Sequence, residues 1–159
     1  MPADIEARLA RLGLKLPDAP SPAANYVPYV VAGGLVFIAG QAPVAGGQYQ
    51  SVGRVGAEVT LEAAQAAARL CGLNVLAQVK AAAGSDWSRV ARCVRVCGYV
   101  SSAPDFFEQP KVVDGASDLM VQALGDAGKH ARSALGVYAL RGNAPVIIDA
   151  IFELTAGDR

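Results

Sequence analysis

The stretch from Lys129 to Leu154 constrains the fold of this chain more than any other part of the sequence. Two apolar segments flank Arg141-Gly142-Asn143, and glycine and asparagine adopt the backbone angles that tight connections need. The pattern predicts two strands joined as a hairpin that closes the chain. The first strand nevertheless begins with His130 and Arg132, and a permanently charged guanidinium entering an apolar strand needs a partner or water.

The remaining pattern predicts an α+β architecture, with mostly antiparallel strands and the helices along one face of the sheet. Apolar residues at helical spacing predict helices at residues 3–13, 60–83 and 112–127, with Thr60 as the N-cap of the long helix and Gly84 after its end. Strands are expected up to Ala32, from Leu35 through Ala39 and at residues 90–100, with loops at 44–57 and 102–112. After the first helix, the predicted order is β-β-α-β-α-β-β.

The length of 159 residues fits one domain. Residues 1–24 are expected to form an N-terminal helix and a Pro-rich extension, and residues 25–154 the core. No repeat or low-complexity linker divides the chain.

The chain is apolar for a protein of this size, with 53% hydrophobic residues and a mean hydropathy of +0.31. No apolar run reaches the roughly 18–20 residues of a membrane span, and the charged N-terminus does not resemble a secretory signal. Contacts between subunits explain the apolar surplus better, because obligate interfaces resemble a core cut in half. The composition therefore predicts an oligomer and no membrane partner.

Charge and cysteine content narrow the possible partners. Fourteen basic residues balance fourteen acidic ones, so a nucleic-acid partner is not expected. Cys71, Cys93 and Cys97 form no Cys-x-x-Cys pair, and four-residue spacing in a strand predicts that the last two share a face. No metal or cofactor is expected, and reduced thiols favour a cytoplasmic location.

Most catalytic signatures are missing from the sequence. It contains neither a phosphate-binding GxxxxGK[ST] loop nor an HExxH metal helix, and the sole histidine belongs to no recognisable nucleophile motif. The polar residues left at strand and helix ends are Tyr29, Gln41, Asp114, Arg132 and Asp149.

Three blocks, NYVPYVVAGGLVFIAGQAP, HARSALGV and VIIDAIFEL, resemble the RidA/YjgF family, also described as L-PSP endoribonuclease-like. The resemblance runs from about Asn25 to Leu154. It implies a chorismate-mutase-like fold and a homotrimer with ligand clefts between neighbouring subunits. The N-terminal extension and the segment from Ser102 to Val112 resemble a longer, divergent branch of this family.

The resemblance implies that Arg132 pairs with a substrate carboxylate, because a guanidinium offers two parallel N–H donors that lysine does not. The alternative is an arginine that extends to solvent or pairs with Asp149. The resemblance also makes Tyr29 a cleft residue, while Ser133 and Ala134 would position the ligand with their backbone groups. Gln41 matches a family residue that is structural rather than catalytic.

Three positions depart from the family pattern. Asp114 stands where members often have Asn, and an aspartate is also a routine residue at a helix N-terminus. Ala134 replaces a Cys common in active members. Ile147 replaces the Glu that orients the attacking water, and Asp149 would replace that Glu as acid or base only in a rearranged cleft.

Two functional hypotheses follow from the resemblance. The first is an enzyme that hydrolyses reactive 2-imino or enamine acids to 2-keto acids and ammonia, with Arg132 binding the carboxylate. The second is a protein that binds a small carboxylate metabolite in the same cleft without turnover. Ribonuclease activity is disfavoured by the neutral charge and the single histidine.

Overall fold

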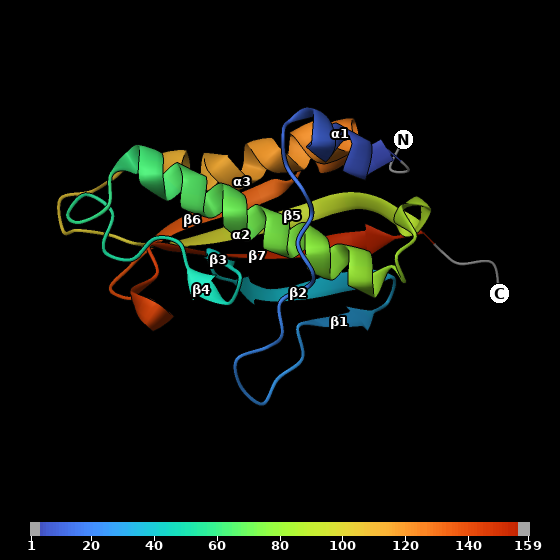
Figure 1. Cartoon of the computed structure of the whole chain (residues 1–159), viewed down its shortest axis with the longest axis horizontal. Helices are drawn as coiled ribbons and strands as arrows, with labels where there is room; N and C mark the ends of the chain where they lie inside the picture. The colour runs from blue at the N-terminus through green and yellow to red at the C-terminus, as the bar shows by residue number, and fades with distance from the viewer. Residues whose placement is uncertain (1–3, 156–159) are drawn as a thin grey trace.

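The computed structural model describes residues 4–155, which form one five-stranded sheet covered on one face by helices (Figure 1). The strand order is β1-β2-β7-β5-β6. The strands are β1 (Tyr29–Ala32), β2 (Leu35–Gln41), β5 (Val90–Ser101), β6 (Ala131–Val137) and β7 (Val146–Leu154). The helices are α1 (Ile5–Arg11), α2 (Leu61–Ala82) and α3 (Gln109–Leu124). The predicted α+β architecture is confirmed.

Helix α2 has the ends that its sequence predicts. The Thr60 side chain accepts a hydrogen bond from the backbone N–H of Ala63 at 3.1 Å, and Gly84 follows the helix with a φ of +67°. Helix α3 begins at Gln109 rather than at residue 112, because Pro110 fits the first turn of a helix. The predicted loop at 44–57 contains a small hairpin of β3 (Val44–Ala45) and β4 (Gln48–Tyr49).

The predicted hairpin between the last two strands is wrong. The turn at Arg141–Asn143 exists, with positive φ at Gly142 and Asn143, but β5 lies between β6 and β7. Strand β6 pairs with β5 in parallel, whereas β7 pairs with β5 antiparallel. The connection after β6 therefore crosses one strand before the chain returns to the sheet, and Arg132 lies on an edge strand.

Irregular pairing in β5 changes which side chains share a face. One extra residue of β5 is accommodated between Val90 and Arg92, and another between Cys93 and Arg95. Arg92 and Arg95 are therefore both exposed despite their opposite parity. The same shift corrects the prediction for two cysteines: Cys93 lies opposite Phe152, while Cys97 lies opposite Asp149 on the other face.

Helix α1 packs against α3, and its residues Ile5 and Leu9 are both buried. Glu6 fixes its position, because its carboxylate accepts hydrogen bonds from the Trp87 indole at 3.1 Å and the Lys80 ammonium at 2.6 Å. The N-terminal helix is thus part of the core.

The two faces of the sheet differ in their cover. One face packs against α2 and α3 around Phe152, Ile148 and Val96. Among the described residues, no helix lies over the opposite face, which we call the open face (Figure 1). Cross-strand pairing places the following apolar residues on it: Val30, Phe37 and Ile151 in one row, and Ile147, Tyr99 and Leu135 in another.

Candidate functional site

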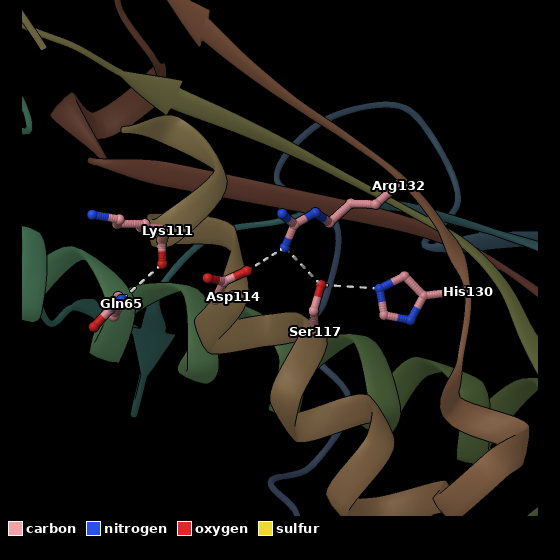
Figure 2. A network of polar contacts seen from close by, with 6 residues as sticks. All are labelled: Gln65, Lys111, Asp114, Ser117, His130 and Arg132. Carbon is pink, nitrogen blue, oxygen red and sulfur yellow. Dashed lines mark hydrogen bonds and ion pairs between the residues drawn. The ribbon is translucent and has the colours of Figure 1, made fainter. Parts of the chain in front are cut away.

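Arg132 reaches from edge strand β6 to helix α3. It lies opposite the fully buried Val96, so its side chain is on the helix-covered side of the sheet. Its Nη1 donates to Asp114 Oδ1 at 2.6 Å and to Ser117 Oγ at 3.3 Å (Figure 2). The charge that enters the apolar strand is thus balanced by a helix residue, and not by Asp149.

The ion pair leaves part of the guanidinium available. Both of these hydrogen bonds use Nη1, and among the described residues Nη2 and Nε of Arg132 donate no hydrogen bond to protein. The Arg132 side chain is 26% exposed and that of Asp114 is 45% exposed. Solvent or a small anion can therefore reach the guanidinium, although the Asp114 charge opposes a second carboxylate.

A serine and the sole histidine complete this cluster. Ser117 Oγ lies 2.9 Å from His130 Nε2 (Figure 2). His130 Nδ1 lies 2.6 Å from the Gly128 carbonyl oxygen. The sequence prediction missed Ser117. Its spacing of three residues from Asp114 was the available signal, because residues three apart share one helix face.

Ser133 and Ala134 follow Arg132 in β6, and their side chains lie on opposite faces of the sheet. Ser133 is on the open face, where its hydroxyl accepts a hydrogen bond from Arg95 Nη2 at 3.4 Å. Ala134 is partly buried against the core. Only their backbone groups adjoin Arg132, and their ligand-binding roles stay predictions.

Asp149 belongs to a separate cluster on the open face. It accepts a hydrogen bond from the Tyr99 hydroxyl at 2.8 Å, and Cys97 lies beside the same tyrosine. The pKa of Tyr99 is raised mainly by its hydrogen bonding with Cys97, and to a smaller extent by its hydrogen bond with Asp149. Because β5 separates β7 from β6, Asp149 and Arg132 do not meet within one chain.

A pocket of about 650 Å³ lies beside the Pro-rich extension, near the opposite edge of the sheet. We call it the extension pocket, and its lining includes residues 17–23, Tyr26, Gly40, Gln41, Tyr49, Asn74 and Arg141. Tyr29 packs against the core, whereas Tyr26, which the sequence prediction missed, lines this pocket. Arg132 does not line it.

Asn74 stiffens the wall of the extension pocket. Its amide nitrogen donates to the carbonyl oxygens of Ala42 and Val44, both at 3.0 Å. Gln41 has a similar structural role, because its amide donates to the Ala39 carbonyl oxygen at 2.9 Å.

Other kinds of site find no support in residues 4–155. This part of the chain holds no group of three or more His, Cys, Asp or Glu side chains able to bind a metal ion. None of its helices combines the length and apolar character that crossing a membrane requires.

Comparison with known proteins identifies a family and several relatives. Residues 6–153 match the model of the family described as "YjgF/chorismate mutase-like, putative endoribonuclease". Protein TCP17 of Trypanosoma cruzi is 45% identical over 151 residues, covering 94% of this chain and 94% of that protein. The solved structure of Atu1372, a protein of unknown function from Agrobacterium tumefaciens, is 46% identical with a TM-score of 0.90, covering 95% of this chain and 92% of that one.

A more distant relative was solved with a small molecule. E. coli TdcF with bound serine is 25% identical with a TM-score of 0.63, and the match covers 85% of this chain and 92% of that one. The fold is thus shared over most of the chain with both solved proteins, and more closely with Atu1372.

Proposed function

Because the chain belongs to the YjgF/chorismate-mutase-like family, we propose that it hydrolyses reactive 2-imino and enamine acids to 2-keto acids and ammonia. Arg132 would bind the substrate carboxylate. The observation that carries this proposal is the anchored guanidinium. Asp114 and Ser117 hold one nitrogen of Arg132, while the other N–H groups point to no acceptor among the described residues.

An anchored guanidinium suits carboxylate binding for two reasons. Its planar fork forms two parallel hydrogen bonds with a carboxylate, and its anchoring means that little side-chain freedom is lost on binding. Partial burial against α3 also strengthens the attraction relative to open water.

A cleft between neighbouring copies would complete this site. Arg132 and the extension pocket lie near opposite edges of the sheet, so one chain alone does not bring them together. In the proposed homotrimer, the β6 edge of one copy would lie beside the extension pocket of the next. Serine in TdcF, an amino acid with a carboxylate, supports a ligand of this class.

Hydrolysis of an imine does not require a strong catalytic base from the protein. Hydrolysis of an imine is intrinsically easy, so positioning the substrate and stabilising its charge account for much of the acceleration. Arg132 would hold the carboxylate, and the backbone of Ser133 and Ala134 would orient the imine toward water.

The test generates 2-iminobutanoate in situ with an amino-acid oxidase and follows its disappearance with and without the purified protein. Acceleration above the buffer rate is expected for wild type. Arg132→Ala should lose it, and Arg132→Lys, which keeps the charge but not the fork, should lose most of it. Imine loss at the buffer rate with correctly folded wild type would refute the enzyme proposal.

Binding without turnover is the second candidate. It is favoured by Ile147, which offers no proton-transfer group, and by Asp149, whose carboxylate is engaged by Tyr99. Calorimetry with 2-ketobutanoate separates the two, because saturable binding that Arg132→Ala abolishes, without catalysis, supports only this candidate. RNA cleavage is not proposed, since the chain has no net charge to attract a polyanion.

A further inference from the structure

The Arg132 cluster contains a hydrogen-bond chain whose direction can be assigned. The Gly128 carbonyl only accepts, so His130 Nδ1 carries the proton of that 2.6 Å bond. In the neutral imidazole Nε2 is then an acceptor, and Ser117 donates to it at 2.9 Å. Arg132 Nη1 donates to Ser117 Oγ. The chain therefore runs from Arg132 through Ser117 to His130, as Figure 2 shows, and it ends at the Gly128 carbonyl oxygen.

Packing against α3 fixes this hydrogen-bond chain at Gly128 and at Ser117. A Cβ on Gly128 would lie 2.1 Å from the Met120 carbonyl oxygen, so the turn that offers the Gly128 carbonyl lies tightly against α3. Ser117 lies on α3 itself, one turn after Asp114. His130 and Ser117 are partly buried, so both are held in place yet remain reachable from solvent.

We propose that His130, acting through Ser117, is the proton-transfer group of the Arg132 site, a role for which Ile147 has no suitable atom. This inference rests on the proposed function. A hydroxyl held between a guanidinium and the basic nitrogen of an imidazole is poised to pass a proton, because the imidazole accepts it and the cation stabilises the oxygen.

The proton movements balance for an iminium substrate. Water forms a C–O bond as the π electrons of C=N move to nitrogen; one water proton passes to Ser117, whose own proton passes to His130 Nε2. The imidazolium then returns a proton through Ser117 to the amine nitrogen. The C–N bond breaks as the hydroxyl oxygen forms the carbonyl, and the departing ammonia takes the hydroxyl proton to leave as ammonium.

The charges around His130 make its protonation sensitive to a ligand bound at Arg132. Arg132 and Asp114 form one ion pair beside it, Lys129 and Asp126 form another at 2.8 Å, and Arg92 donates to the Lys129 carbonyl. Asp118, next to Ser117, is the remaining nearby acid on α3. A carboxylate bound at Arg132 adds negative charge to this set, which favours protonated His130.

The first experiment follows the titration of His130 by proton NMR, which is unambiguous because the sequence has one histidine. With saturating 2-ketobutanoate, the wild-type midpoint should move to higher pH, because the bound carboxylate adds negative charge beside His130. In Ser117→Ala the movement should shrink. An unchanged midpoint in a wild-type sample that calorimetry shows to be saturated would overturn the inference while leaving the carboxylate site standing.

The second experiment compares kcat and KM across pH 5–9 for wild type, His130→Gln and Ser117→Ala. Glutamine keeps a polar contact with Ser117 but does not titrate, so kcat should fall by about a hundredfold and lose its acid limb. The dissociation constant for 2-ketobutanoate should stay within about threefold, which separates proton transfer from mere positioning of Arg132. Val121→Ala, on the exposed side of α3, is the matched control.

The outcomes distinguish the two proposals. An active wild type whose kcat and pH profile are unchanged in His130→Gln overturns this inference alone. A wild type that neither binds 2-ketobutanoate nor turns over imine overturns the proposed function, and the inference falls with it.

Discussion

At the scale of single residues, the Asp114–Arg132 pair sets the chemistry of the site. The carboxylate fixes one nitrogen of the guanidinium and also offsets part of its charge. The two residues are 18 positions apart in sequence, and their contact depends on where α3 lies on the sheet. Sequence patterns predicted both residues as candidates but not their pairing, because no local spacing specifies such a distant contact.

Asp114→Asn should tighten carboxylate binding. Asparagine keeps an oxygen to accept from Arg132 Nη1 but removes the opposing charge, so the dissociation constant for 2-ketobutanoate should fall about three- to tenfold. Calorimetry at low salt measures it. Weaker binding in this variant would mean that the charge of Asp114 positions Arg132 instead of competing for it.

Glu6→Gln should lower stability in a pH-dependent way. The hydrogen bond from Lys80, followed by that from Trp87, lowers the Glu6 pKa. A lowered carboxyl pKa stabilises the fold above the unfolded-state pKa of about 4.3, and this stabilisation is lost as pH falls through the folded-state pKa. Because the side chain is about half exposed, urea unfolding should show a deficit of only about 0.5 kcal/mol at pH 7, and this deficit should shrink in acid, below the unfolded-state pKa. An equal deficit at pH 7 and in acid would assign the effect to packing.

At the scale of elements, α2 and α3 approach each other closely beside the site. A Cβ on Gly115 would lie 2.1 Å from the backbone oxygen of Gln65, and the Gln65 side chain also donates to the Lys111 carbonyl at 2.8 Å (Figure 2). Glycine at this crossing lets the helix that carries Asp114 and Ser117 lie flat against its neighbour.

Gly115→Ala should therefore destabilise the protein. In an exposed helix this change gains up to about 1 kcal/mol of helix propensity, but here the clash is with backbone and overpacking should cost about 2 kcal/mol or more. Thermal unfolding should show a lower Tm, with Val121→Ala as the α3 control. A raised Tm would show that the helices separate without cost.

Helices and turns that are marked by cap and turn residues could be predicted from the sequence. The pairing of strands that are distant in sequence could not. Thr60 and Gly84 mark the ends of α2 in sequence, and the Gly33-Gly34 turn marks the β1–β2 hairpin. The turn at Gly142-Asn143 carries the same signal, yet it joins strands that are not neighbours. Turn chemistry specifies that the chain bends there, whereas the burial of all strands together decides that β5 lies between β6 and β7.

At the scale of the whole molecule, the open face is the part that a single chain leaves uncovered. Phe37 is 43% exposed and Leu135 is 48% exposed, and both stand in apolar rows on that face. Exposed apolar rows on an uncovered sheet face are typical of an interaction site, which accords with the oligomer that the composition predicts.

Phe37→Asp should separate the copies of the proposed homotrimer. Wild type should sediment with three times the 16.3 kDa mass of one chain, and a charge in the apolar row should shift the variant toward the mass of one chain. Val52→Asp, also exposed but outside the sheet, is the control that should leave the mass unchanged. Wild type that sediments as one chain would contradict the trimer directly.

The distance between Arg132 and the extension pocket implies that activity depends on protein concentration. A molecule that must touch both needs two chains at once. Turnover per chain should then drop steeply once the protein is diluted below the concentration at which its subunits dissociate. Weak binding of carboxylates to Arg132 of a single chain should persist. A low concentration of the protein would then be enough to reduce its activity, without an inhibitor.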